Sequence, residues 1–575
     1  MADRKWTFPP AERALAGTLA RALGMSAVTA QVLVNRGVRD PGAAKRFLQP
    51  ELADLVDPLK FTQMPLAIER LGRALREGET IAIFGDYDVD GTAGTAILAK
   101  YFQLFGRDPI IRVPHRMTEG YGLSALAVGE FADAGAKVLV TIDCGTNDHE
   151  EIELAHSRGM DVIVLDHHET PTRESAALAL INPKADSNYP FKGISSVGIA
   201  FKMAWALSSG LEKSKKLGAA YEKYLLDAMA YVALGTVADV SPITDENRVF
   251  VSFGLKAIQE CTSPGLRALA DKVGLTGKKV DTFDISFKLA PRLNALGRLG
   301  SARNTVELLM TEDPARIAEL MQLLESSNRA RKDIEDEIFR QAVDQIDRSP
   351  ELQRDPVIVV ADERWHVGVV GIVAARLVDR FARPAFVLAI EGDVAKGSGR
   401  SVQGFGLHEA IEASRDLLLS GGGHAMAAGA GVRKDRLADF RIRVNEYAAK
   451  VLAQGMPEAT LPVDDEVRLS GVTQGLVKEL ARLEPHGEGN RAPRLVASHL
   501  RVAGQPRLMG KKNDHLSFHV SEPDGPGLRA VAFGRADWFD AIGAARTVSL
   551  AFRPVLNEWK GRSSVELHVD DMKFV

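Results

Sequence analysis

Residues 81–91 read IAIFGDYDVDG, an apolar segment that stops at three aspartates spaced two residues apart, Asp86, Asp88 and Asp90. The apolar part predicts a buried strand, and the three carboxylates come close together whether the strand continues or ends in a tight loop. Carboxylates crowded that closely cannot all stay ionised without a cation. Gly91 lets the backbone turn, and ILAKYFQLF, which follows shortly after it, has helical spacing. We therefore predict a strand, an acidic loop and a helix.

The same arrangement recurs twice further along the chain. AKVLVTIDCG (136–145) has a strand pattern that ends at Asp143, and MDVIVLDHH (160–168) has another that ends in Asp-His-His. The helix-length stretch EEIELAHSRG lies between them, so the order strand, helix, strand predicts a parallel sheet. Ligands of such sheets lie outside the carboxyl ends of the strands. We expect four side chains to converge at this edge: Asp88, Asp90, Asp143 and His167.

An alternative interpretation is that these acids cap loops and that the histidine is a hydrogen-bonded core residue. Aspartate is common where strands end, so this alternative is the better one for any single strand end. This alternative is not favoured when three consecutive strands all end in such residues.

Carboxylates with one or two imidazoles form a mixed, fairly hard ligand set. Such a set suits manganese or magnesium better than a metal that prefers thiolates. Two such ions activate a water and stabilise both oxygens of an in-line phosphoryl displacement. The predicted chemistry is hydrolysis of a phosphoester or a phosphoanhydride.

Composition fits a large cytoplasmic enzyme. The chain has 575 residues, 45% hydrophobic and 26% charged, which predicts about three to five domains. Its two cysteines, Cys144 and Cys261, are too few for a disulfide framework and fit a reducing cytosol. Cys144 lies next to Asp143, but no base is obvious that would make it a nucleophile. The N-terminal MADRKWTFPP has no apolar signal core, and no apolar run is long enough to span a membrane.

Charge and motif content narrow the class of enzyme further. The net charge is −4, yet residues 491–575 carry 13 Lys and Arg against 9 Asp and Glu. A mildly basic end fits local contact with a polyanion. The chain has no G-x-x-x-x-G-K-[ST] motif, so nothing indicates ATP-driven work.

The middle of the chain has a helical character. YEKYLLDAMAYVALGTVADV (221–240) is an apolar segment that delivers Asp239, which is either a helix cap or one more metal ligand. Residues 311–350 are dense in charge and have apolar residues at helical intervals, which predicts a long amphipathic helix joining two domains.

A second region of alternating strands and helices follows that helix. It contains two glycine-rich stretches that we interpret as loops, AKGSGRS (395–401) and SGGGHAMAAGAG (420–431). Such loops bring backbone donors close to phosphate, and Arg400 and His424 would add charge. The alternative is that each stretch is simply a turn.

From about residue 460 onward the sequence is different in kind. Short alternating strands are separated by turn residues, and five strands over this length fit a small barrel of the oligonucleotide-binding (OB) type. The barrel carries four aromatic residues that either stack on bases or, as is commoner in strand-rich domains, form its core: Phe518, Phe533, Phe552 and Trp559.

These motifs together carry a family resemblance. GDYDVDG, TIDCG, LDHH and GTVADV stand in the order seen in the DHH phosphoesterase superfamily, and SGGGHAMAAG resembles the signature of its DHH-associated domain. Within that superfamily, four stretches resemble the RecJ family of single-strand-specific 5′ to 3′ DNA exonucleases: EGYGLS (119–124), SSVGIAFK (195–202), APRLNALGRL (290–299) and LEPHGEGN (483–490). The resemblance spans nearly the whole chain.

The resemblance implies an α/β multidomain fold. Its expected parts are an N-terminal helical segment (1–70), a parallel-sheet DHH catalytic domain (71–310), a long connecting helix (311–350), a second α/β DHH-associated domain (351–455) and a C-terminal OB-fold β-barrel (456–575).

The resemblance also implies roles for individual residues. The superfamily's metal ligands fall on Asp88, Asp90, Asp143, His167 and Asp239, and the catalytic residues Asp86 and His168 complete the site. Relatives hold the 5′ end through residues that correspond to Arg298, Ser398 and Arg400, with Asn294 and His424 as further contacts. The implied cofactor is Mn²⁺ or Mg²⁺, as two ions. GTAGT after the aspartate triplet and TND after DCG depart from the family pattern, but neither removes a ligand.

The function implied is metal-dependent hydrolysis of single-stranded DNA from a 5′-phosphate end to mononucleotides, in DNA recombination and repair. We expect a cytoplasmic monomer that has no membrane contact, with a single-strand-binding protein and a helicase as candidate protein partners. Two rivals remain open. A superfamily phosphodiesterase of short oligonucleotides would not need the terminal barrel, and a non-catalytic single-strand-binding relative would not need the intact acids and His167.

Overall fold

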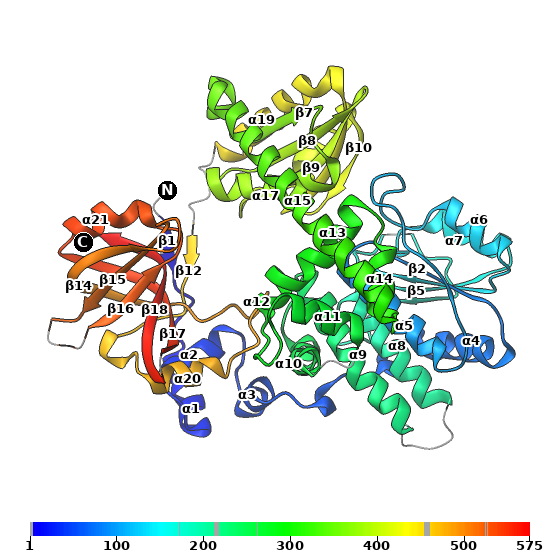
Figure 1. Cartoon of the computed structure of the whole chain (residues 1–575), viewed down its shortest axis with the longest axis horizontal. Helices are drawn as coiled ribbons and strands as arrows, with labels where there is room; N and C mark the ends of the chain where they lie inside the picture. The colour runs from blue at the N-terminus through cyan, green and yellow to red at the C-terminus, as the bar shows by residue number, and fades with distance from the viewer. Residues whose placement is uncertain are drawn as a thin grey trace. The chain divides into compact units, whose positions relative to one another are not determined.

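The computed structural model describes residues 4–171, 173–211, 218–260, 263–453, 460–523, 525, 527–559 and 561–574. They belong to two compact units, each built from segments far apart in the sequence (Figure 1). Unit 1 comprises Met1–Val56, Pro242–Ser252 and Thr460–Val575, and unit 2 comprises Asp57–Ser241 and Phe253–Ala459. Among the described helices, none is by itself long and apolar enough to cross a membrane, and one pair bent by 118° passes such a test by length and composition.

Unit 2 contains a parallel five-stranded sheet after α4 (Met64–Glu77), which confirms the strand, helix, strand pattern. Its spatial order is β3-β2-β4-β5-β6, and all its neighbours run parallel. Strands β2 and β4 are buried on both faces, which is why their sequences read as continuous apolar runs. The bounds of the strands are β2 Ile81–Gly85, β3 Ile110–Arg112, β4 Val138–Ile142, β5 Asp161–Leu165 and β6 Ala179–Ile181.

Helices cover both faces of this sheet. α6 (Ala125–Asp133) and α7 (His149–Ser157) share one hydrophobic cluster with alternate residues of β2, β4 and β5. α5 (Val89–Gln103) and α8 (Ser196–Leu211) pack on the sheet and on each other, and α9 (Ala219–Ala238) packs against both helices. Gly91 lies in the first turn of α5, where an added Cβ would stand 2.7 Å from the backbone of Asp86.

The chain then passes through short helices into the long helix that the charge pattern predicted. α14 (Arg303–Met310) precedes α15 (Pro314–Arg348), a single helix of 35 residues capped by Asp313, whose carboxylate accepts the backbone N–H of Ala315 at 3.0 Å. Upstream of these, α12 (Thr282–Asp284), a π-helical turn (Ile285–Leu289) and α13 (Ala290–Leu299) follow one another directly.

A second α/β layer structure follows α15. Its sheet has the order β10-β11-β9-β8-β7, with β7 and β8 parallel and the other neighbours antiparallel. α17 (Val367–Phe381) and the end of α15 share a hydrophobic cluster with one face, and α18 (Leu407–Glu412) and α19 (Leu437–Leu452) share one with the other. The bounds of the strands are β7 Ile358–Asp362, β8 Ala385–Glu391, β9 Val394–Arg400, β10 Leu418–Gly423 and β11 Ala427–Arg433.

The interpretation of the two glycine-rich stretches as loops is wrong. The first is most of β9, and the second forms β10, β11 and the tight turn between them. Glycine is needed here because neighbouring chains approach closely: a Cβ at Gly397 would lie 2.1 Å from the carbonyl oxygen of Val387 on β8. Tight strand packing therefore requires glycine at Gly397, Gly399 and Gly423, whereas Gly422 has open space around it.

The C-terminal part of unit 1 is the expected barrel. β14 (Leu495–Met509), β15 (His515–Ser521), β16 (Leu528–Ala532), β18 (Arg562–Phe574) and β17 (Thr547–Trp559) pair in this order, and β14 also pairs with β17, which closes the barrel.

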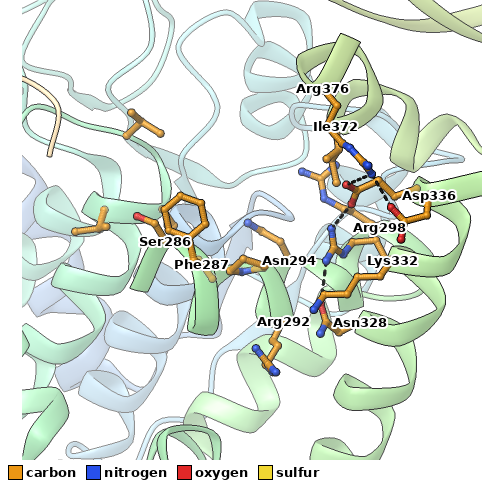
Figure 2. Close-up of a pocket in the computed structure, with 17 residues that line it drawn as sticks. Ser286, Phe287, Arg292, Asn294, Arg298, Asn328, Lys332, Asp336, Ile372 and Arg376 are labelled. Atoms are coloured by element: carbon orange, nitrogen blue, oxygen red, sulfur yellow. Dashed lines mark hydrogen bonds and ion pairs between the residues drawn. The ribbon is translucent and has the colours of Figure 1, made fainter. Parts of the chain in front are cut away.

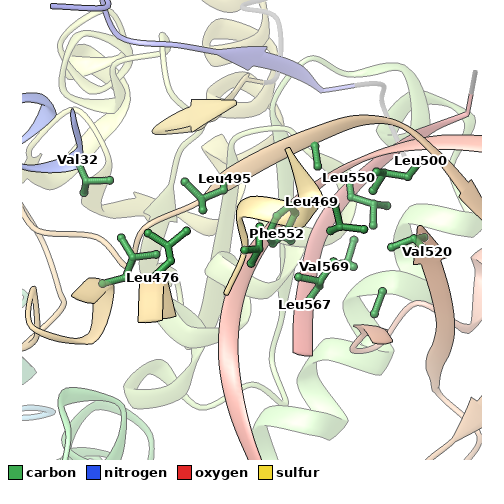
Figure 3. Close-up of a cluster of buried hydrophobic side chains, with 14 of the residues drawn as sticks. Val32, Leu469, Leu476, Leu495, Leu500, Val520, Leu550, Phe552, Leu567 and Val569 are labelled. Carbon is green, nitrogen blue, oxygen red and sulfur yellow. The ribbon is translucent and has the colours of Figure 1, made fainter. Parts of the chain in front are cut away.

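The core of the barrel extends to helices from both ends of the chain (Figure 3). Val32 of α2 (Ala27–Asn35) and Leu476 of α20 (Gln474–Ala481) belong to the same cluster as the barrel strands. Phe518 and Phe552 are fully buried core residues. Phe533 is 50% exposed, and the side chain of Trp559 lies outside the described part of the chain.

Candidate active site

The carboxyl ends of three neighbouring strands deliver the side chains that the sequence singled out. Asp86 follows β2, Asp143 follows β4, and Asp166, His167 and His168 follow β5. Because β2, β4 and β5 are adjacent and parallel, these residues meet at one edge of the sheet.

Two helix ends complete the same edge. Asp88 caps α5, and its carboxylate accepts the backbone N–H of Asp90 at 2.8 Å and of Gly91 at 3.1 Å. Asp90 lies in the first turn of α5 and accepts the backbone N–H groups of Ser196 and Val197 at 2.8 and 3.1 Å. Asp239 stands at the C-terminal end of α9.

All seven residues predicted as metal ligands or catalytic groups come together here. Their oxygen and imidazole nitrogen atoms form three overlapping groups, each within 4.8 Å. The Nε2 atom of His167 lies 3.4 Å from Oδ1 of Asp143 and 3.8 Å from Oδ2 of Asp239. The three groups are Asp143 with His167 and His168, Asp90 with His167 and Asp239, and Asp86 with Asp88 and Asp143.

The acids of this cluster repel one another. Asp86, Asp90 and Asp143 are almost completely buried. Burial first, and the charge of neighbouring carboxylates second, raises the pKa of each of these three groups above its ordinary value. Burial likewise raises the pKa of Asp239 to about 6. In addition, Oδ1 of Asp86 is buried without a hydrogen-bond partner in the described residues.

These observations fit a bound divalent cation. The donors are mostly carboxylate oxygens, which hard cations prefer, and a cation would offset both the mutual repulsion and the unpaired oxygen of Asp86. Burial lowers the pKa of His167 to about 4, so its imidazole is neutral at physiological pH, the form that ligates a metal.

His168 is held in a different way from His167. Its Nδ1 lies 2.7 Å from Oδ1 of Asp166, which also accepts the backbone N–H groups of both histidines. Burial lowers the pKa of His168, but the hydrogen bond with Asp166 outweighs it and the net pKa is raised. Because Asp166 holds His168 at Nδ1, Nε2 is the ring nitrogen that is left for other contacts.

Two further residues, Tyr121 and Arg116, line a cavity together with these acids, and neither had a predicted role. The hydroxyl of Tyr121 donates to the carbonyl oxygen of Asp143 at 3.0 Å and lies 3.0 Å from Nδ1 of His168. The guanidinium of Arg116 lies 4.7 Å from the centre of the Tyr87 ring. The signal that could have found them is the EGYGLS motif, which contains Tyr121 and follows Arg116 closely.

Arg116 belongs to an arginine cluster with Arg298 and Arg400. Arg298 donates to the carbonyl oxygen of Gly368 at 3.0 Å, and Arg400 donates to that of Gly399 at 2.8 Å. Burial, followed by the charges of the neighbouring arginines, lowers the pKa of Arg298 to about 9, and burial and Arg116 lower that of Arg400. In the described part of the chain no carboxylate forms an ion pair with any member of this cluster, an arrangement that suits a bound anion.

Two of the other predicted substrate contacts, Ser398 and Asn294, lie near members of this cluster, and His424 does not line the cavity. Ser398 and Arg400 face the same point of α17, because a Cβ at Gly371 would stand 3.2 Å from Oγ of Ser398 and 3.5 Å from Arg400. Asn294 lines the cavity next to Arg298. His424 is exposed in the turn between β10 and β11 and does not line it.

One cavity of about 330 Å³ therefore has acids on one side and arginines on the other. Its charged lining is Asp86, Asp88, Asp143, Asp239, His168, Arg116 and Arg298. Such a cavity can hold cations and a phosphate next to each other.

Comparison with known families matches three parts of the chain. Residues 80–236 match the DHH family, N-terminal domain, residues 354–450 match the DHHA1 domain, and residues 463–571 match the RecJ OB domain.

Curated relatives are similar over nearly the full length. The chain is 32% identical to the single-stranded-DNA-specific exonuclease RecJ of Bacillus subtilis, covering 99% of this chain and 70% of that protein. It is 35% identical to the protein of the same name from Dickeya dadantii, covering 95% and 96%, and 34% identical to that from Escherichia coli, covering 94% and 95%.

Solved structures agree with this assignment. The crystal structure of RecJ from Thermus thermophilus in complex with Mn²⁺ superposes with a TM-score of 0.83 at 31% identity, covering 99% of this chain and 79% of that one. The Mg²⁺ complex gives 0.77 at 30% identity, with 99% and 78% covered. The chain belongs to the RecJ family.

Proposed function

We propose that this protein is a metal-dependent exonuclease that hydrolyses single-stranded DNA from the 5′ end to mononucleotides. The observation that carries the proposal is that one cavity is lined both by buried acids and by Arg116 and Arg298, and neither arginine has a carboxylate partner among the described residues. The relatives named single-stranded-DNA-specific exonucleases support the substrate, and the closed OB barrel supports contact with a single strand.

The cofactor proposed is Mn²⁺ or Mg²⁺, as two ions. The two RecJ structures from Thermus thermophilus that are similar to this chain are complexes with Mn²⁺ and with Mg²⁺. The ligands would be Asp88, Asp90, Asp143, His167 and Asp239, and bound ions would supply an activated water and stabilise the charge on the phosphoryl oxygens.

The chain's own residues would bind and orient the substrate. Arg298, Arg400 and Ser398, with Arg116, would hold the terminal 5′ phosphate through charge-assisted hydrogen bonds. Asn294, which lies beside Arg298, would contact the same nucleotide. His424 is proposed only as an outer contact, because its side chain stands away from the cavity.

His168 would hold or deliver a proton at Nε2. Asp166 fixes the imidazole through Nδ1 and raises its pKa, and the Tyr121 hydroxyl stands at the same nitrogen. Asp86 presents a buried carboxylate with an unpaired oxygen to the same cavity and would act beside it.

The setting proposed is cytoplasmic DNA recombination and repair, by a monomer. A single-strand-binding protein and a helicase are the candidate protein partners, since either would present a free single strand.

One experiment tests the proposal. Single-stranded DNA labelled at either end, with and without a 5′ phosphate, is incubated with the protein and Mn²⁺, and products are followed with time. We expect mononucleotides to appear first from the 5′ end, and faster from 5′-phosphorylated strands. Release from the 3′ end first would refute the polarity, hydrolysis of only short oligonucleotides would favour the phosphodiesterase alternative, and binding without cleavage would favour the non-catalytic one.

A further inference from the structure

A second, larger cavity adjoins the active site. Its volume is about 700 Å³, and Ala238, Asn294 and Arg298 line both cavities. The two cavities therefore share a wall, and the larger one lies next to the place where a phosphate would meet the acids.

One wall of this larger cavity is basic. Lys332 of α15 and Arg376 of α17 lie on this side (Figure 2), and Arg331 of α15 also lines the cavity. Arg376 joins the two helices, because it donates to Glu335 at 3.0 Å and to Asp336 at 2.8 Å, and Arg331 donates to Glu335 within α15 at 2.7 Å. Cations outnumber carboxylates in the lining: Arg292, Arg298, Arg331, Lys332 and Arg376 against Glu335 and Asp336. This wall suits the phosphates of a strand.

The opposite wall is apolar and aromatic. Phe287 lies across the cavity from the basic side chains in Figure 2 and is 65% exposed. Phe283, 58% exposed, stacks on it with ring centres 4.4 Å apart and planes 28° from parallel. Val240 lines the same cavity, and its positive φ of 62° is rare for a β-branched residue.

The local backbone explains why Phe287 stands outward. Pro291 has no N–H to donate to the carbonyl oxygen of Phe287, so the helix cannot continue with regular bonding at that point. The backbone N–H of Ala290 bonds instead to Ile285, five residues back, which makes a π-helical turn. Such turns occur often at functional sites.

A single exposed aromatic residue would need no explanation. Here two phenylalanines stack on each other, both are more than half exposed, and one lines a basic cavity that adjoins the active-site cavity. Phosphate-binding side chains facing aromatic rings are the combination that proteins use to hold single-stranded nucleic acid.

We propose that the pair Phe283 and Phe287 is a stacking platform for bases of the substrate strand, while its phosphates face Arg331, Lys332 and Arg376 across the cavity. The inference rests on the proposed function and adds where the strand lies. An aromatic face accepts every base, so the platform would hold the strand without restricting its sequence.

A scan with abasic sites tests the platform. The double variant Phe283→Ala with Phe287→Ala and the parent are compared in Mn²⁺ on 5′-phosphorylated single strands that carry one abasic site at successive positions. On the intact strand we expect KM of the double variant to rise about 5- to 150-fold, the range of one stacked base. In the parent, an abasic site at one or two adjacent positions should cause the same rise, and there the variant should lose nothing further.

Two further variants separate stacking from folding and from general exposure. Phe287→Leu keeps an apolar side chain but has no ring, and we expect it to show a smaller rise in KM with the same positional pattern. Phe8→Ala removes a 48% exposed ring in unit 1, and KM should stay at the parent value.

The proposal is overturned if the double variant has the parent's KM on the intact strand, or if its loss is the same at every abasic position. Failure of the proposed function would look different, because the parent itself would then release no mononucleotides.

Discussion

The active-site cavity is lined by acidic and by basic groups, and burial disfavours the charged form of both. On the acidic side, burial raises the pKa of Asp86 and Asp143, and on the basic side it lowers the pKa of Arg298. Within the described residues, no carboxylate of the acidic side forms an ion pair with an arginine of the cluster. Pairing them would have relieved both sides. The pKa shifts have opposite directions because the two sides carry opposite charges, so the acidic side suits cations and the basic side suits a phosphate.

The strongest test of the acidic side is Asp143→Asn. Asparagine tolerates the positive φ of 65° at this position, so the fold should survive. We expect hydrolysis in Mn²⁺ to fall by at least about 1000-fold, because loss of a metal ligand removes several kcal/mol of transition-state stabilisation. Binding of single-stranded DNA, measured by fluorescence anisotropy, should stay near the parent value. Turnover within tenfold of the parent would end the assignment of Asp143 as a ligand.

The basic side is tested by Arg400→Ala. Each charge-assisted hydrogen bond contributes about 1.5–3 kcal/mol, so preference for 5′-phosphate over 5′-hydroxyl strands should fall roughly ten- to hundredfold. Residual cleavage and metal binding should remain. Arg433→Ala is the matched control, because Arg433 lies in the same domain but is paired with Asp435 at 2.9 Å. A variant that still discriminates between the two 5′ ends as the parent does would place the phosphate elsewhere.

A pH series on Asp239→Asn separates charge repulsion from packing. The folded pKa of Asp239 is about 6, above the unfolded value of about 3.9. The folded state therefore holds the proton more tightly, and the group destabilises the parent increasingly as pH rises from about 4 through 6. In a metal chelator, we expect the variant to exceed the parent's unfolding free energy by up to about 3 kcal/mol above pH 7, with the difference shrinking at pH 5.

Adding Mn²⁺ should reverse that order, since a cation bound to the ionised carboxylate stabilises only the parent. Denaturant unfolding followed at pH 5, 6, 7 and 8, with and without the metal, gives both results. A difference that does not change with pH would mean that packing, rather than charge, sets the effect.

The smallest effect is expected outside the cavity, at Arg501 of β14. It is exposed on the barrel, so Arg501→Ala should weaken long single strands a few-fold and leave the shortest substrates unchanged. The slope of binding against salt should become shallower by about one counterion. Equal weakening of short and long strands would show that the barrel does not extend the binding path.

The acidic side was predictable from sequence because its residues are local to strand ends. Asp86, Asp143 and His167 each follow an apolar run, and parallel strands must bring such positions to one edge. Spacing alone left Asp239 open between cap and ligand, and in the structure it both ends α9 and lies 3.8 Å from His167. Its partners come from a different part of the chain, and spacing alone carries no information about that.

The basic side depended on resemblance, and in part it was missed. Arg298, Arg400 and Arg116 come from α13, β9 and the segment after β3, so nothing in their spacing groups them. The glycine-rich stretches looked like loops because glycine is read as a turn signal, whereas Gly397 serves close packing of strands. The stacked pair at Phe283 and Phe287 had no sequence signal beyond the proline that follows it.

The rotation of the connecting helix α15 about its axis decides which of its side chains line the larger cavity. The helix is held near one end by Glu325, which pairs with Arg292 at 2.7 Å, and further along by Glu335, which pairs with Arg376. One residue inserted between Glu325 and Asn328 would rotate everything beyond it by about 100°. Arg331 would then take the place of Lys332, and Lys332 would leave the lining, although no side chain had been removed. The basic wall is thus encoded as much by the count of residues along the helix as by their identity.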